Sequence, residues 1–271
     1  MKVPPAEIGD RIRPRATWDD LVLPIETLVA LREVAETATT HETMASQLRV
    51  ALPSARGPSL VVLLAGPCGT GKTLAAEVLA GALSIDLFRV DLTSVVSKWI
   101  GETEKNLARV FDAAASSGAV LFFDELDTLL RERIEASGSR ERYANVELAY
   151  LLHYLLQKME GHSGLSILAT KLRANLDQAF LRRMGFVIDL PFPDEAARRA
   201  LWERHLPKQV PLAADVNFDT LSLLGLPGSA IRDAVLKCVS LALVTGEPIT
   251  MTHLQTAARR EVARFDRCAD L

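Results

Sequence analysis

The sequence predicts a doubly wound α/β domain with a parallel sheet, followed by a small all-helical domain. Three observations lead to this prediction. Short apolar runs alternate with helical patterns up to about residue 193, as expected for buried parallel strands joined by helices. A glycine-rich loop follows the first of these runs. Beyond residue 193 only helical periodicity remains.

Length and composition suit this architecture. The 271 residues are enough for one sizeable core and a smaller second domain. Hydrophobic residues make up 49% of the chain and charged residues 24%, and the formal net charge is -3. These values argue against a disordered chain and against a generally basic surface for nucleic acid.

The cysteines and the N-terminus predict a cytoplasmic protein. Cys68, Cys238 and Cys268 are far apart and form no C-x-x-C pair or metal-ligand cluster, so we expect no structural zinc. The N-terminus lacks the apolar stretch of a signal peptide, and no run reaches the roughly 18 apolar residues of a membrane span. No membrane span is therefore expected.

The first part of the chain is expected to lead into the α/β core. Residues 1–17 show little periodicity and predict an extended arm or linker. From 25 to about 52 apolar residues recur at helical spacing, and we expect a helical pair that ends in a loop at 53–58. The α/β domain with its helical lead-in is predicted to cover 18–193, and the helical domain 194–271.

Continuous apolar runs bounded by turn residues predict five strands. Such runs are typical of strands that are buried on both faces of a sheet. The predicted strands are 59–65, 86–91, 119–123, 165–170 and 186–190. After Pro193 the helical pattern predicts helices at 194–205, 219–224, 228–245 and 250–265, without a convincing strand.

A phosphate-binding motif lies between the first predicted strand and a helical run. Residues 66–73 match G-x-x-x-x-G-K-[ST], the Walker A pattern of P-loop NTPases. Its glycines let backbone N–H groups face the phosphates, and the following helix N-terminus adds a positive dipole end. Lys72 is expected to reach the β- and γ-phosphates, and the Thr73 hydroxyl to bind Mg²⁺. The predicted ATP-binding residues are Gly66, Pro67, Cys68, Gly69, Thr70, Gly71, Lys72, Thr73 and Leu74.

Two acids, Asp124 and Glu125, follow the third predicted strand in the manner of a Walker B motif. Beside the phosphate loop, Asp124 would join Thr73 at the Mg²⁺, and Glu125 would act on the water that attacks the γ-phosphate. Taken alone, two acids at a strand end could equally be solvated loop residues. The upstream phosphate loop favours the catalytic interpretation.

These residues resemble the AAA clade of the AAA+ ATPases, and especially its bacterial single-module members. The resemblance covers about residues 17–265 and rests on motifs at 18–24, 97–106, 122–127, 142–145 and 176–183. It implies that ATP and Mg²⁺ are bound at the interfaces of a homo-oligomeric ring, usually a hexamer. It also implies that ATP hydrolysis drives work on a protein substrate.

The resemblance assigns a pore loop to Lys98, Trp99 and Ile100, because the stretch 98–101 contains the family's aromatic, aliphatic, glycine pattern and ends in Gly101. Trp99 would then contact a threaded polypeptide through its large apolar ring. The alternative is a core tryptophan at the start of a helix.

The resemblance also places four residues beside the adenine. Asp19 and Val22 match the segment that lies against the base in relatives, and Gly228 and Ser229 fall where the first helix of the lid approaches it. The apolar part of this set could equally be ordinary packing between domains.

Two departures from the family pattern concern the hydrolysis step. Relatives carry an asparagine sensor after the fourth strand, whereas this chain has Lys171, which donates hydrogen bonds but does not accept them. Relatives place an arginine directly before Phe186, whereas this chain has Gly185. Arg183 is expected to supply the arginine finger to a neighbouring subunit, but the sequence leaves open which of Arg182 and Arg183 reaches across, and both could instead be surface charges.

The predicted function is an ATPase that remodels or threads a protein in a ring, with Glu125, Lys72, Arg183 and Lys171 as catalytic residues. The alternative is a nucleotide-dependent scaffold with little or no turnover, because Lys171 and Gly185 weaken hydrolysis. A third hypothesis is a DNA-dependent AAA+ protein. The acidic balance and the lack of a DNA-binding motif weigh against it, so no nucleic-acid partner is expected.

Overall fold

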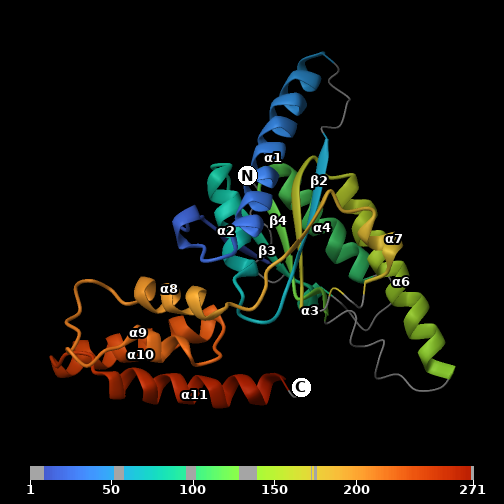
Figure 1. Ribbon diagram of the computed structural model, residues 1–271. Coiled ribbons are helices and arrows are strands. Elements are labelled where there is room, and N and C mark those ends of the chain that lie inside the picture. The colour runs from blue at the N-terminus through green and yellow to red at the C-terminus, as the bar shows by residue number, and fades with distance from the viewer. Residues whose placement is uncertain are drawn as a thin grey trace. The chain divides into compact units, whose positions relative to one another are not determined.

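The computed structural model describes residues 9–51, 58–95, 102–127, 139–171, 173 and 176–269. The chain divides into two compact units, each with its own hydrophobic core (Figure 1). The first, here called the sheet unit, comprises 1–21, 25–66 and 72–190. The second, here called the helical unit, comprises 22–24, 67–71 and 191–271. The middle of the phosphate loop therefore packs with the helical unit, although both its ends belong to the sheet unit.

One sheet with the strand order β1-β3-β4-β5-β2-β6 forms the centre of the sheet unit, as far as the chain is described. From β3 to β6 all neighbouring strands run parallel, and only β1 is antiparallel to its neighbour β3. From β2 the chain crosses to β3, beyond β5 and β4, and then reverses direction, passing through β4 and β5 to reach β6 on the other side of β2. The predicted doubly wound fold is confirmed. The strands are β1 Asp10–Ile12, β2 Ser59–Ala65, β3 Leu87–Asp91, β4 Val120–Asp124, β5 Gly164–Thr170 and β6 Phe186–Asp189.

Helices cover both faces of this sheet. Val61 and Leu63 of β2 pack with buried residues of α4, α6 and α7. The alternate positions Val62 and Leu64 are also fully buried, on the face where α1 and α2 lie against the strands (Figure 1). Burial of successive residues explains why the strands are continuous apolar runs. These helices are α1 Ile25–Ala51, α2 Lys72–Ala82, α4 Glu102–Ser117, α6 Ser139–Glu160 and α7 Gln178–Leu181, with α3 Leu92–Val95 and the 3-10 turn η1 Trp18–Asp20 beside them.

The predicted helical pair at 25–52 is wrong, because α1 is one continuous helix. The polar stretch in its second half does not break it. The hydroxyls of Thr39, Thr40 and Thr43 each donate to the carbonyl four residues earlier, so their polar groups are satisfied within the helix. Among the described residues, no helix is long and apolar enough to cross a membrane.

The segment predicted as an arm contains β1. Arg11 in this strand forms an ion pair with Asp86, next to the start of β3. Farther along, the backbone N–H groups of Arg15 and Ala16 donate to the Glu77 carboxylate of α2, at 2.9 and 3.2 Å. These contacts attach residues 10–16 to the sheet unit.

The helical unit consists of α8 Glu195–His205, α9 Phe218–Ser222, α10 Gly228–Thr245 and α11 Met251–Ala269. Side chains of Asp194 and Asn217 cap α8 and α9. The only strand-like pairing described here is an isolated bridge between Leu212 and Ile249. The predicted helical C-terminal region is confirmed, and its core surrounds the fully buried Trp202.

We expect Trp202→Ala to lower the free energy of unfolding of the helical unit by about 3–5 kcal/mol, because it leaves a large cavity. Trp202→Phe should cost much less, since Trp202 Nε1 has no hydrogen-bond partner among the described residues. Urea denaturation followed by circular dichroism measures both losses. Leu223→Ala is the control, because Leu223 is 66% exposed. Equal losses for Trp202→Ala and Leu223→Ala would contradict the assigned core.

Candidate functional site

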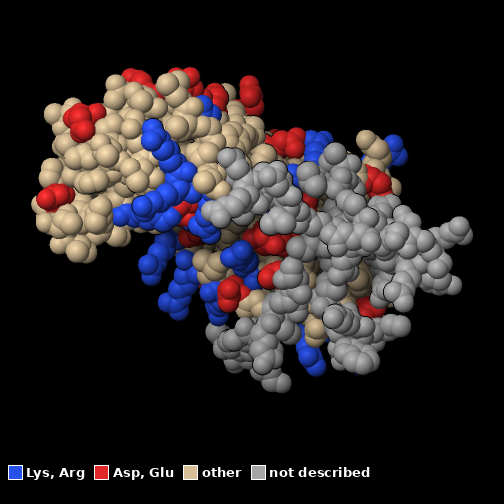
Figure 2. Space-filling model, turned by 90° about the horizontal axis from the view of Figure 1, so that it is seen from below, with Lys and Arg blue, Asp and Glu red and all other residues tan. Residues whose placement is uncertain are grey.

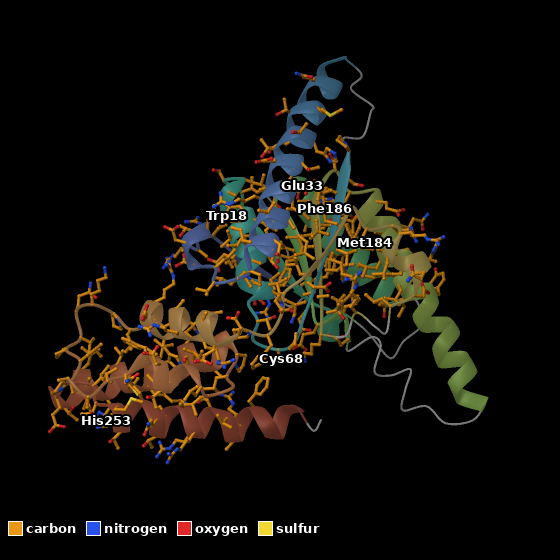
Figure 3. All side chains as sticks on the ribbon, in the orientation of Figure 1. Trp18, Glu33, Cys68, Met184, Phe186 and His253 are labelled. Atoms are coloured by element: carbon orange, nitrogen blue, oxygen red, sulfur yellow. The ribbon has the colours of Figure 1, made fainter. Side chains whose placement is uncertain are left out.

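The phosphate loop connects the end of β2 to the start of α2. Its backbone is left-handed at Gly69 and Gly71, with φ values of 77° and 101°. Glycine adopts this conformation without steric cost, so the loop can curl tightly in front of the N-terminus of the 11-residue helix α2. Cys68, labelled in Figure 3, is exposed in this loop. The predicted loop therefore has the backbone form that binds phosphate.

Internal hydrogen bonds hold the loop together. Lys72 Nζ donates to the carbonyl of Gly66 at 2.6 Å, which folds the lysine back across the loop. The Thr70 hydroxyl donates to the carbonyl of Pro67 at 3.0 Å. At its start, the N–H of Gly66 donates to the carbonyl of Thr170 at the end of β5, at 3.1 Å. This last bond attaches the start of the loop to the carboxyl end of β5.

Thr73 and Asp124 converge from α2 and β4. Thr73 Oγ1 lies 3.5 Å from Asp124 Oδ2, and Asp124 is nearly buried. The other oxygen, Asp124 Oδ1, accepts the N–H of Glu125 at 3.0 Å. A hydroxyl and a carboxylate are the hard oxygen donors that Mg²⁺ prefers, with phosphate oxygens and water completing its shell. The residues therefore fit the predicted metal.

Arg89 of β3 is a member of the site that the sequence analysis did not identify. Its Nε and Nη2 atoms donate to Asp124 Oδ2 at 3.1 and 2.7 Å. The sequence did contain a signal for this role. Arg89 is the one basic residue in the strand run 86–91, which is otherwise apolar between an acid at each end. A charge inside such a strand requires a partner, and the neighbouring strand supplies it.

Glu125 directly follows β4 and has a left-handed backbone, with φ of 56°. This conformation is uncommon outside glycine and costs on the order of 1–3 kcal/mol. Its side chain is exposed, and Oε1 lies 3.9 Å from the Lys171 ammonium. The residue at the sensor position thus forms an ion pair with the predicted catalytic acid. Figure 2 views the molecule from below and shows Asp and Glu side chains lying among Lys and Arg, between the grey atoms.

Asp127 fixes the backbone at the sensor position. This carboxylate is buried, and it accepts the Thr170 hydroxyl at 2.7 Å and the N–H of Lys171 at 2.6 Å. Asp127 belongs to the motif at 122–127, but the sequence analysis gave it no role. Its two bonds tie the loop after β4 to the end of β5, so Glu125 and Lys171 are held on adjacent, connected segments.

Arg183, the predicted arginine finger, is bound within its own chain. Its Nε and Nη2 atoms donate to the two oxygens of Glu160, both at 2.7 Å, and Nη1 lies 3.2 Å from His153 Nδ1. The hydrogen bond from Arg183 holds the pKa of the Glu160 carboxyl below its ordinary value, and the same bond raises the pKa of Arg183. Arg182 is exposed, and its side chain has no hydrogen bond or ion pair within the part of the chain that is described.

Gly185, the second departure, is tightly placed between Met184 and Phe186, which are both labelled in Figure 3. Its N–H donates to the carbonyl of Val61 in β2 at 2.8 Å. A Cβ atom there would lie 2.9 Å from Leu60 Cδ1. A side chain at this position therefore requires Leu60 to move.

Within the helical unit, the start of α10 contacts the phosphate loop. The N–H of Ser229 donates to the carbonyl of Gly69 at 3.2 Å. A Cβ atom on Gly69 would clash with Ser229 Oγ and lie 3.0 Å from Pro227. Of the other predicted adenine residues, Gly228 begins α10 and Val22 packs on the core of the helical unit. Asp19 belongs to the sheet unit, where it is exposed in η1. The predicted pore-loop residues Lys98, Trp99 and Ile100 lie outside the described residues.

Comparison with known proteins identifies the family of this nucleotide-binding arrangement. The family model "ATPase family associated with various cellular activities (AAA)" matches residues 62–192, from β2 to just beyond β6. The "Uncharacterized AAA family ATPase y4kL" of Sinorhizobium fredii is 32% identical over 240 residues, which cover 88% of this chain and 69% of that protein. The chain belongs to the AAA family of ATPases. The predicted resemblance to this family of ATPases is confirmed.

Other AAA relatives are longer proteins. "ATP-dependent zinc metalloprotease FtsH 3" of Sphaerobacter thermophilus is 33% identical over 261 residues, covering 93% of this chain and 50% of that protein. "Cell division cycle protein 48 homolog" of Archaeoglobus fulgidus is 30% identical over 228 residues, covering 83% of this chain and 30% of that protein. This AAA chain thus spans half or less of the length of these two relatives.

We expect Gly69→Ala to weaken ATP binding at least tenfold, because the new methyl group clashes with Ser229 and strains the loop. Gly118→Ala is the matched control, since Gly118 is also left-handed, with φ of 65°, but has open space at its Cβ. Titration with a fluorescent ATP analogue measures affinity, and thermal melting measures the stability cost of each change. Equal affinity of the two variants would show that the close packing around Gly69 is unimportant for binding.

Proposed function

We propose that this AAA protein hydrolyses ATP at its phosphate loop and uses the cycle, in a ring of identical subunits, to remodel or thread a protein. The observation that carries the proposal is the convergence of three features at one edge of the sheet. They are the phosphate loop, the Thr73 and Asp124 oxygen pair, and the exposed carboxylate of Glu125.

The residues divide the work as follows. The loop and the N-terminus of α2 bind the phosphates, and Lys72 exchanges the Gly66 carbonyl for phosphate oxygens. Thr73 and Asp124 hold Mg²⁺, which supplies positive charge to the phosphates when it is bound. Glu125 orients the attacking water and accepts its proton. Asp127 acts indirectly, because it positions the backbone of Lys171.

The ion pair between Lys171 and Glu125 favours slow turnover. The ammonium is already paired with the carboxylate, so the carboxylate must exchange this partner for water before it can act as a base. A scaffold that binds ATP and rarely hydrolyses it is therefore the second candidate function. Both candidate functions use the same nucleotide site, and at that site they differ only in the rate of ATP hydrolysis.

We further propose that Arg182, and not Arg183, is the finger offered to a neighbouring subunit. Arg183 would have to leave both Glu160 and His153, whereas Arg182 is already exposed at the end of α7. An arginine delivered to the γ-phosphate of a neighbour contributes on the order of 10³–10⁵ in rate. This proposal chooses Arg182 from the two arginines that the sequence left open.

The proposal also includes a protein substrate, a hexameric ring and a cytoplasmic location. The Sphaerobacter relative is named as an ATP-dependent zinc metalloprotease, which supports work on a protein substrate. Lys98, Trp99 and Ile100 would contact that substrate, and Asp19, Val22, Gly228 and Ser229 would lie near the adenine. Residues 18–193 would form the nucleotide-binding domain and 194–271 its lid.

Phosphate release with MgATP is expected to rise more steeply than linearly with protein concentration, because the site is completed by a neighbour. Glu125→Gln should lower the rate by about 10² or more while ATP binding persists. Lys171→Asn should raise the rate of phosphate release severalfold, because the substitution removes the ammonium that pairs with Glu125. If the wild type binds ATP but releases almost no phosphate, and Lys171→Asn restores release, the scaffold is the correct function.

Arg182→Ala should abolish the concentration-dependent part of turnover while leaving the thermal stability of the protein unchanged. Arg183→Ala should instead lower the melting temperature, because it removes the bidentate pair with Glu160, and should retain cooperative turnover. Phosphate release and calorimetry on the two single variants separate the roles. Loss of cooperative turnover in Arg183→Ala alone would return the finger to Arg183.

A further inference from the structure

Arg89 and Asp124 lie on the same face of the sheet because of the strand register. Arg89 pairs with Phe122 across β3 and β4, and Asp124 is two residues beyond Phe122. Alternate residues of a strand share a face. The neighbouring positions Phe88 and Val90 belong to the core beneath α4 and α6, so Arg89 lies on the opposite face, where α2 contributes Thr73. The register alone therefore directs the guanidinium toward the acid of the metal site.

The guanidinium takes the oxygen that also faces Thr73. Asp124 Oδ2 receives both Arg89 bonds and lies 3.5 Å from the Thr73 hydroxyl, whereas Oδ1 is occupied by the N–H of Glu125. Of the two Asp124 oxygens, Oδ2 is the one nearer the Thr73 hydroxyl, and a cation held by these two residues would use it. It would then share this oxygen with the positive charge of Arg89.

The exposure of the two side chains shows which of them can move. The Asp124 side chain is 11% exposed and that of Arg89 is 42% exposed. Asp124 is also fixed by its bond to the Glu125 backbone. Arg89 has a long side chain whose head reaches solvent, so its own charge stays hydrated if it withdraws, and a cation that replaces it would keep the buried Asp124 carboxylate paired.

We propose that Arg89 occupies Asp124 Oδ2 before the metal binds and competes with Mg²⁺ for this oxygen. This proposal rests on the proposed function, since it concerns the metal of the ATP site. Because like charges repel, Arg89 raises the Mg²⁺ concentration that tight ATP binding requires. The residue thus sets the metal requirement of the protein.

The test is the Mg²⁺ dependence of nucleotide binding by the full chain. A fluorescent ATP analogue is titrated at a series of free Mg²⁺ concentrations with wild type, Arg89→Met and Arg89→Lys. Arg89→Met removes the charge at similar length and should lower the half-saturating Mg²⁺ concentration by about tenfold. Arg89→Lys should give a smaller shift in the same direction, because a lysine cannot make the two-nitrogen contact.

Arg11→Met is the matched control. Arg11 also pairs with an aspartate beside β3, but that partner is Asp86 at the opposite end of the strand. Its removal should leave the Mg²⁺ dependence unchanged. Binding of Mn²⁺ followed by electron paramagnetic resonance gives a second readout that does not depend on turnover, and Arg89→Met should bind Mn²⁺ more tightly in the presence of ATP.

The outcomes separate this proposal from the proposed function. An unchanged or increased Mg²⁺ requirement in Arg89→Met, or in Arg89→Lys if the methionine variant does not fold, would overturn the competition. Circular dichroism melting establishes which variants are folded. Failure of the wild type to bind the ATP analogue at any Mg²⁺ concentration would contradict the ATP site itself, whatever the variants do.

Discussion

Burial of the central strands on both faces is the constraint on which this structure depends. β2, β4 and β5 are covered by helices on each side, so a polar group within them is costly unless it has a partner; the buried Ser166 hydroxyl of β5, which has none among the described residues, is an exception. The polar residues are consequently displaced to the carboxyl edge. There the phosphate loop, Asp124, Glu125 and Lys171 gather from segments that are distant in the sequence. The site is a consequence of how the core is built.

A second regularity appears at that edge, because Asp124 and Glu125 are each paired with a cation that lies in a flanking strand or directly after one. Asp124 is bound by Arg89 of β3, and Glu125 is paired with Lys171 after β5. A triphosphate is strongly anionic, and two uncompensated carboxylates would oppose its approach. With both acids paired inside the chain, the edge can accept an anion first and rearrange its pairs afterwards. Binding and chemistry can then be separate events.

Much of the fold was predictable because apolar runs and glycine-rich spacing are local signals. The five parallel strands, the phosphate loop and the helical C-terminal region all follow from them. The contacts within the site were harder to predict from the sequence, because Arg89 and Asp124 are 35 residues apart and Asp127 and Thr170 are 43 residues apart. Such pairs depend on strand register. The pairing of Arg183 with Glu160 depends on helix packing, and no periodicity in the sequence reports it.

The left-handed backbone of Glu125 places stability and activity in conflict at one residue. Glycine or asparagine would adopt this conformation more readily, and either would relax the turn after β4. Selection for a more heat-resistant chain would therefore favour losing the carboxylate. A glutamate persists there only while its chemistry is useful. If ATP turnover ceased to be selected, Glu125 would be among the first residues of the site to be replaced, because the replacement would increase stability.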